Sequence, residues 1–227
     1  MKLPRKKTIL IIPVVLFLLL LSWKLLPIPG SAEDPQAALN TAIAHLEDAP
    51  ALSYQMVSHL TVEGTSKEYG NIHGELLQNG NTHLEGEILG SPLHLYRLGD
   101  STYRLDPVTE QWQKTIERTE EEENALFYET NPLKQLEISD YGEIEELAAE
   151  ERNSRCFRFS PSLSENALTR YFTDLVYTVY CSDDLLTKVV VNGKLTNNSV
   201  EGQLNIVTQF TLLPADYTLE APITEAP

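Results

Sequence analysis

Basic side chains are scarce in this 227-residue chain, which has 17 Lys and Arg against 33 Asp and Glu and a formal net charge of −16. Nucleic-acid binding requires a basic face that contacts phosphates, so this charge argues against a nucleic-acid partner. The sequence also lacks GxSxG, HExxH and the glycine-rich phosphate loop, and no set of nucleophile, base and metal ligands can be located. We therefore expect no enzyme activity and no cofactor.

Cysteine is scarce as well, because Cys156 and Cys181 are the only two. Neither lies in CxxC spacing, and no cysteine follows the apolar run near the N-terminus as a lipobox would require. In an exported domain two cysteines most simply form one disulfide, and the alternative is a pair of buried free thiols. Since Cys156 lies in RCFRF and Cys181 ends the strand-like VYTVYC, we predict a disulfide between neighbouring strands.

The five histidines show no ligand spacing typical of a metal site. In the register expected for the hairpin around residues 79–81, His73 and His83 share a face but lie about 13 Å apart along it. His94 is expected to be a hydrogen-bonded core histidine beside Tyr96. The sequence therefore predicts no metal site.

One long apolar run lies near the N-terminus, between Thr8 and Leu26, directly after a short basic segment. As a helix it would reach about 28 Å, close to the hydrocarbon thickness of a bilayer. The positive-inside tendency then makes residues 1–30 a cytoplasmic basic stub and transmembrane signal-anchor, and residues 31–227 an extracytoplasmic domain. We expect a single-pass protein of the cell membrane, and a signal peptide cleaved after Gly30-Ser31-Ala32 is the alternative.

The exported part begins with a predicted amphipathic helix over residues 35–47, and from Ser53 the hydrophobic period changes from about four residues to two. A second helix is predicted over 161–175. Short strands are predicted over the β-like segments, separated by turns at Asn79-Gly80 and Gly99-Asp100; they lie near 71–78, 82–89, 93–98 and 101–106. The pattern predicts an α+β fold, in which a strongly curved antiparallel sheet forms a half-open β-barrel that encloses a few amphipathic helices.

Several of these features together resemble the bacterial lipoprotein-carrier superfamily, which includes the periplasmic carrier, its outer-membrane receptor and the mycobacterial lipid-carrying lipoproteins. The features are the first helix, the β meander, Tyr103-Arg104-Leu105-Asp106 followed by residues 111–114, and the late segment VYTVYCSDDLLTKVVV. The similarity covers roughly residues 35–213. It implies a half-open barrel that can hold acyl chains, although the soluble carriers lack an anchor and the lipidated members carry a lipobox.

The leading hypothesis is a membrane-anchored, non-catalytic protein that binds a membrane lipid or a lipoprotein acyl chain inside the half-barrel. The alternative is an envelope interaction or sensor module, whose barrel is filled by its own side chains and whose partner is another envelope protein. The candidate cavity residues are predicted to share one apolar face, with Trp112 at a mouth of the barrel; the same residues would form a packed core in the alternative. They are Met56, Leu60, Ile72, Leu76, Leu84, Ile88, Tyr103, Leu105 and Trp112.

Overall fold

The computed structural model describes residues 34–115, 130–149, 153–162, 167–196 and 201–223. The chain divides into a unit of residues 1–34 and a unit of residues 35–227, and every element below belongs to the second. The predicted stub and signal-anchor of residues 1–30 lie outside the described residues and remain a prediction. Within the described part of the chain, no helix has the length and apolar character needed to cross a membrane.

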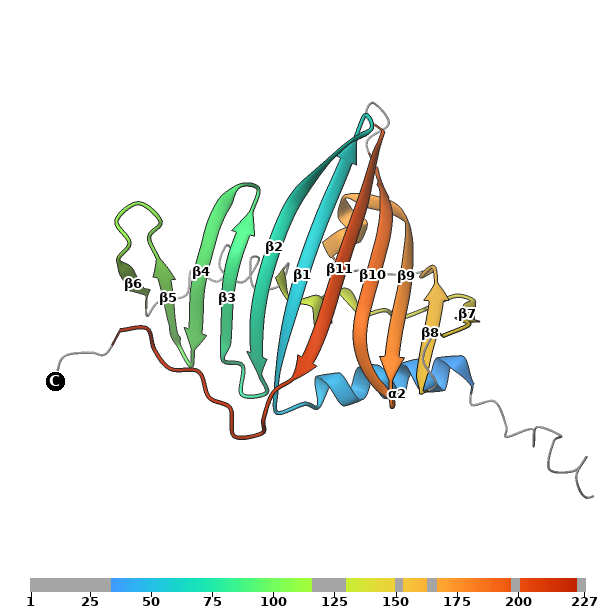
Figure 1. Cartoon of the computed structure of the whole chain (residues 1–227), viewed down its shortest axis with the longest axis horizontal. Helices are drawn as coiled ribbons and strands as arrows, with labels where there is room; N and C mark the ends of the chain where they lie inside the picture. Colours follow the sequence, from blue (N-terminus) through green and yellow to red (C-terminus); the bar gives the residue numbers. More distant parts are fainter. Residues whose placement is uncertain (1–33, 116–129, 150–152, 163–166, 197–200, 224–227) are drawn as a thin grey trace, which may run out of the picture. The chain divides into compact units, whose positions relative to one another are not determined.

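Eleven strands form one antiparallel sheet in the order β6-β5-β4-β3-β2-β1-β11-β10-β9-β8-β7 (Figure 1). The strands are β1 (Ala51–Val62), β2 (Thr65–Leu77), β3 (Thr82–Ile88), β4 (Ser91–Leu98), β5 (Ser101–Leu105), β6 (Trp112–Thr115), β7 (Ile144–Leu147), β8 (Ser154–Phe159), β9 (Phe172–Ser182), β10 (Leu185–Leu195) and β11 (Gly202–Leu212).

The strand order explains why the sheet is open. The first and last strands, β1 and β11, pair in the middle of the sheet, while β6 and β7, which are consecutive in the chain, form its two edges. A closed barrel with this order would pair β6 with β7, and these strands are not paired. The prediction of a large antiparallel sheet that is not closed is therefore confirmed.

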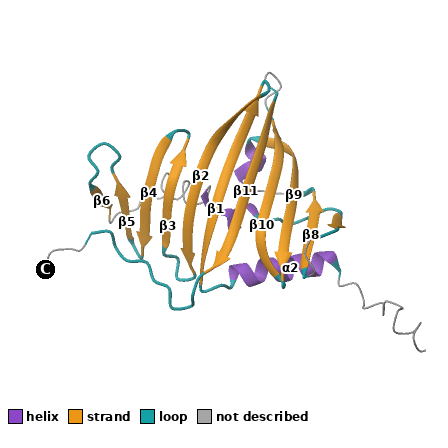
Figure 2. Ribbon diagram, in the orientation of Figure 1, coloured by secondary structure: helices purple, strands orange, loops and turns teal. Residues whose placement is uncertain are grey.

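Helix α2 (Pro35–Glu47) has the bounds expected from the sequence, with proline at its first position, where a missing N–H costs nothing. It contacts β10 and β7 and crosses the sheet near β8 to β10 (Figure 2). Its apolar stripe is buried and joins the main core, which explains why so short a helix is stable. The stripe consists of Ala38, Leu39, Ala42, Ile43 and Leu46.

Two short 3-10 helices complete the described elements. The first, η1 (Pro132–Gln135), is capped by Asn131, whose side chain accepts a hydrogen bond of 3.0 Å from the Leu133 N–H. The second, η2 (Ala167–Arg170), replaces most of the helix predicted over 161–175, of which residues 163–166 lie outside the described part. That prediction was wrong at its end, because Phe172 already begins β9 and the β-branched and aromatic run that follows favours a strand.

The two faces of the sheet differ in what they bury. We call the face that carries Tyr54, Ile72, Leu84 and Val191 the inner face, because its apolar side chains form one core with α2. The opposite, outer face carries Glu75, His83, Tyr96 and Tyr103, which stand in matching positions on β2 to β5. The last described residues run beside the outer face, where the Tyr217 hydroxyl donates a hydrogen bond of 2.6 Å to Glu75.

Candidate functional site

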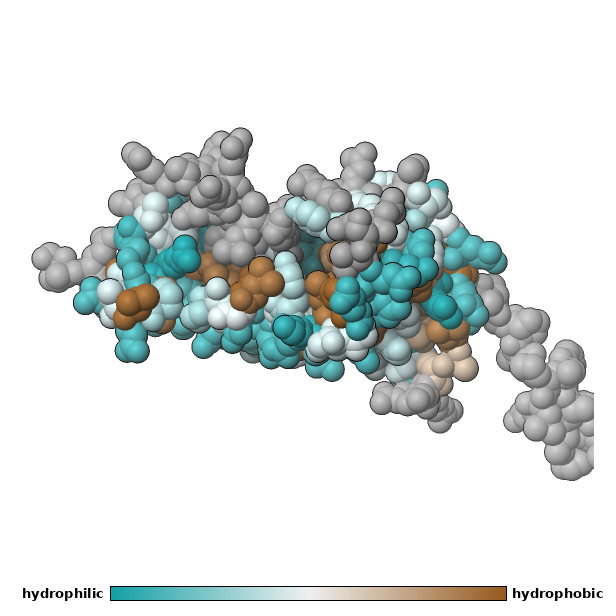
Figure 3. Space-filling view, turned by 90° about the horizontal axis from the view of Figure 1, so that it is seen from above, coloured by the Kyte–Doolittle hydropathy of each residue, from teal (hydrophilic) through white to brown (hydrophobic). Residues whose placement is uncertain are grey.

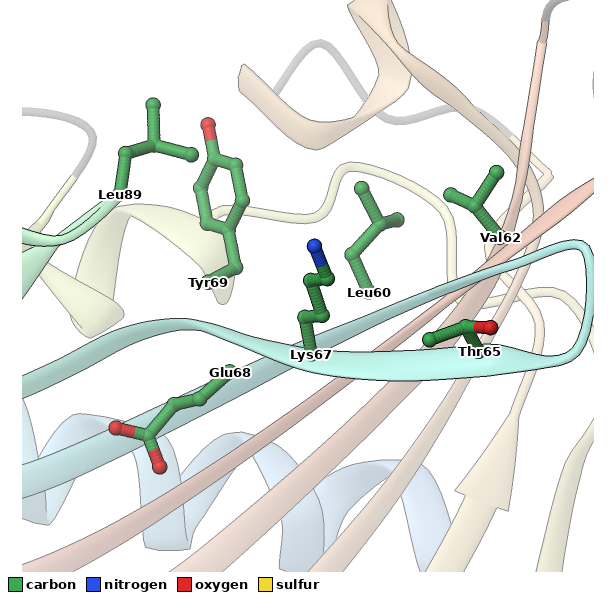
Figure 4. Close-up of a pocket in the computed structure, with 7 residues that line it drawn as sticks. All are labelled: Leu60, Val62, Thr65, Lys67, Glu68, Tyr69 and Leu89. Atoms are coloured by element: carbon green, nitrogen blue, oxygen red, sulfur yellow. The ribbon is translucent and has the colours of Figure 1, made fainter.

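A groove of about 590 Å³ opens at the turn end of the β1–β2 hairpin. Figure 4 shows Leu60, Val62, Lys67 and Tyr69 projecting to the same side, while Glu68 points away. The volume is within the range typical of small-molecule sites, about 300–1,000 Å³. The residues that line the groove are Leu60, Val62, Thr65, Lys67, Glu68, Tyr69 and Leu89.

The groove exists because of one bulge and one tight turn. The β1–β2 register shifts between Ser58 and His59, which leaves Tyr69 unpaired in a bulge. Because of this bulge, the Tyr69 side chain lies on the same side of the sheet as that of Leu60. The β3–β4 turn consists of Leu89 and Gly90, both at positive φ (53° and 75°), as a two-residue type I′ hairpin requires.

The Leu89 N–H donates a hydrogen bond of 2.8 Å to the Tyr69 carbonyl, so the turn is held against the bulge. A leucine at positive φ is strained, and its side chain is 67% exposed, which means that packing does not offset the strain. The exposed Leu89 side chain is therefore available for contact with a ligand in the groove. On the face that Figure 3 shows, the coloured surface is mostly hydrophilic, with hydrophobic residues in separate patches.

One cation lies among the apolar walls of the groove. Lys67 stands opposite Leu60 in the β1–β2 register, and its side chain projects between Leu60 and Tyr69 (Figure 4). In a chain of net charge −16, a lysine between apolar residues offers a local site for an anionic group attached to an apolar body. The groove can therefore hold an amphiphile without any covalent chemistry.

The structure divides the candidate cavity residues into three groups. Leu60 lines the groove. Met56, Ile72 and Leu84 are buried in the core, with exposed fractions of 7%, 2% and 1%, and Leu76 and Ile88 are half-buried against it. The third group consists of Tyr103, Leu105 and Trp112, which lie on the outer face. Contact of these residues with a lipid remains a prediction.

The prediction of one shared apolar face was therefore wrong for Tyr103 and Leu105, and Trp112, predicted at a mouth of the barrel, lies with them on the outer face. For the two flanking hairpins, the shared face of residues 72, 84 and 88 and the pairing of Tyr96 with Tyr103 are confirmed. The register of the first hairpin was wrong by two positions, because His73 pairs with Glu85, two residues from His83. The hairpin between these two hairpins has a two-residue turn, which pairs Leu84 with Leu95 and thus places Tyr96 on the opposite face. Without the β3–β4 register, the sequence does not show whether the apolar residues of the first hairpin and those of the second lie on the same face of the sheet.

The predicted disulfide was also wrong, because Cys156 and Cys181 are free and buried. Cys156 pairs with Tyr180 and Cys181 pairs with Arg155, so the two cysteines are one position out of register and project to opposite faces. Burial raises the pKa of both thiols, that of Cys181 to about 12. Both are therefore protonated and poorly reactive at neutral pH.

The structure brings together a cluster of possible metal ligands that the sequence argument missed. His83, Glu85 and His94 each offer one ligand atom, and the three atoms lie within 4.8 Å of one another. His94, which the sequence-based prediction did not consider as a partner of His83, lies on β4 and pairs with Glu85. The two-residue turn at Leu89-Gly90 is the signal that could have located this cluster.

No protein-family model matches the chain, and no curated protein matches it significantly. Among solved structures the chain is similar to a LolA superfamily protein from Nitrosomonas europaea, with 7% identity, coverage of 79% of this chain and 92% of that one, and a TM-score of 0.32. It is also similar to a DUF1329 family protein from Desulfovibrio piger, with 8% identity, coverage of 82% and 94%, and a TM-score of 0.32. Because these TM-scores are low, we take the function from the chain's own residues.

Proposed function

We propose that the protein is a non-catalytic binder of an anionic amphiphile, such as a fatty acid or a lipid, whose acyl chain occupies the groove at the β1–β2 hairpin. The observation that carries this proposal is the combination of apolar walls at Leu60, Val62, Tyr69 and Leu89 with one cation at Lys67. Each methylene that leaves water for such a wall contributes about 0.8 kcal/mol. The centre of the half-barrel is not part of this site, because Met56, Ile72 and Leu84 are packed there.

The proposal includes a position in the cell. Residues 1–30 would anchor the chain in the cell membrane, and the domain from residue 31 onward would lie on the extracytoplasmic side, within reach of lipids of that membrane. The support is the apolar run from Thr8 to Leu26 behind a basic segment.

The experiment measures the affinity of the intact chain, held in amphipol, for a dansyl-labelled fatty acid. Leu89→Glu should weaken binding about tenfold, because a leucine contact is lost and a carboxylate faces the anionic head group. Val108→Glu is the matched control, since Val108 is 89% exposed and lies outside the groove. Lys67→Gln should weaken binding of the dansyl fatty acid but not of the corresponding fatty alcohol. Absence of saturable binding, or an equal loss in Val108→Glu, would exclude the groove as an acyl site.

A second candidate function is a protein-interaction module with a filled barrel. It is favoured by the low exposure of the inner-face residues, which form one continuous core with α2. In that case the dansyl fatty acid would not bind, and a partner protein would contact the surface around Leu89 and Tyr69, which are 67% and 43% exposed.

A further inference from the structure

The outer face of β3 and β4 carries a cluster of two imidazoles and one carboxylate that the proposed function does not use. Glu85 and His94 are directly paired across the two strands, and His83 is the diagonal neighbour of His94. The His83 and His94 ring centroids are 5.2 Å apart. One ligand atom of each of the three residues lies within 4.8 Å of the others.

Each of the two imidazoles has one nitrogen atom without a hydrogen-bond partner in the part of the chain that the structure describes. The Nε2 atoms of His83 and His94 are both buried and have no hydrogen-bond partner among the described residues. A buried polar atom without a partner costs about 1–3 kcal/mol, so two of them in one cluster need an explanation. A bound cation that accepts both lone pairs provides one.

Glu75 fixes which nitrogen of His83 is available. The Nδ1 atom of His83 lies 2.8 Å from the Glu75 carboxylate, which only accepts hydrogen bonds when ionised. In the neutral imidazole Nδ1 therefore carries the proton, and the lone pair that a metal ion needs lies on Nε2. This carboxylate–histidine arrangement is the one that usually orients histidine ligands of metals.

Two aromatic rings pack against the imidazoles of the cluster. Tyr96 stacks on the His83 ring with centroids 4.1 Å apart, and Trp112 meets the His94 ring edge-on at 4.8 Å. The Tyr217 hydroxyl donates to the other oxygen of the Glu75 carboxylate, so the tail stabilises the residue that orients His83.

We propose that His83, His94 and Glu85 form a binding site for a divalent late first-row transition metal ion, such as Zn²⁺. Imidazole and carboxylate ligands suit such ions, whereas Ca²⁺ and Mg²⁺ prefer oxygen ligands only. Tetrahedral coordination at about 2.0–2.1 Å requires ligand atoms about 3.4 Å apart. Donors at up to 4.8 Å reach this by a closure of about 1.4 Å, within the range of side-chain rotation. Three protein ligands leave the fourth position open to solvent.

The test uses the intact chain in amphipol, treated with a chelator and then titrated with Zn²⁺ against a chromophoric competitor. The expected result is one Zn²⁺ bound per chain and a higher unfolding temperature with metal. Glu85→Gln is the most informative variant, because Glu85 is exposed and its replacement should leave the fold intact. His94→Gln removes a second ligand, and each change should weaken binding by about 100-fold or more. Replacing Zn²⁺ with Co²⁺ should give the visible absorption bands of tetrahedral coordination.

His59→Gln is the matched control, since His59 lies on β1 outside the cluster. Its affinity for Zn²⁺ should equal that of the unchanged chain. The proposal is overturned if the chain binds no Zn²⁺ saturably, or if binding survives both Glu85→Gln and His94→Gln while those variants melt normally without metal. The groove is lined by other residues, so failure of this test would not affect the proposed acyl site.

Discussion

The two halves of the sheet bury side chains in different ways. In the half formed by β8 to β11, the inner face is the more deeply buried one: Tyr177 and Val179 have exposed fractions of 0%, whereas the outer face carries the buried Cys156 beside Tyr180, which is 37% exposed. In the half formed by β2 to β6, both faces carry buried residues, with Leu84 on the inner face and His83 and Tyr103 on the outer face. The first half is a packed scaffold, and the second half carries the histidine cluster on its outer face.

The largest expected effect is in the scaffold half. Tyr177→Ala should lower the free energy of unfolding by about 3–5 kcal/mol, because a fully buried ring stacked on Phe159 leaves a cavity. Tyr96→Ala, which removes a half-buried ring stacked on His83, should cost only about 1 kcal/mol. Chemical denaturation measures both values. Equal losses would show that the two halves do not differ in packing.

A medium effect is expected where the two halves join, at the β1–β2 pair. Tyr54 lies opposite Gly74, and a Cβ at Gly74 would overlap the Tyr54 ring. Gly74→Ala should therefore cost about 1–3 kcal/mol through overpacking. In a double-mutant cycle with Tyr54→Leu, the cost of Gly74→Ala should fall, since the overlapping ring is gone. An unchanged cost would mean that the destabilisation has another source.

A smaller effect is expected at the tail that adjoins the outer face. The hydrogen bond to the Glu75 carboxylate raises the pKa of Tyr217 to about 12, above the value near 10 of an unfolded tyrosine. The stabilisation is therefore fully present below about pH 10 and is lost as the pH rises through about 12. Unfolding free energies of the unchanged chain and of Tyr217→Phe should differ slightly at pH 8 and converge near pH 12. A difference in unfolding free energy that does not change with pH would contradict the hydrogen bond between Tyr217 and Glu75.

The smallest effect is expected from reductant. Because Cys156 and Cys181 are free, a reducing agent should leave the unfolding free energy unchanged, whereas loss of a disulfide typically costs about 2–5 kcal/mol. Iodoacetamide without reductant should add two labels to the unfolded chain and label the native chain slowly. An unfolded chain that takes up no label without reductant would show that Cys156 and Cys181 form a disulfide.

Periodicity in the sequence was sufficient for the scaffold but not for the site. The stripe of α2 and the turn at Gly99-Asp100 follow from local rules, and both are confirmed. The groove depends on a bulge at Ser58 and His59, which a period of two does not predict. The histidine cluster depends on the β3–β4 register. The hydropathy pattern does not show which polar residues share a face.

The most direct test of the acyl site is photo-crosslinking of the intact chain in its own membrane with a fatty acid that carries a diazirine near the end of its chain. Peptide mapping should place the label on residues 60–69 and on Leu89, and excess unlabelled fatty acid should prevent it. Label on Met56 or Leu84 would instead place the acyl chain in the half-barrel centre. Label that is spread over the surface, or absent, would contradict acyl binding by this domain.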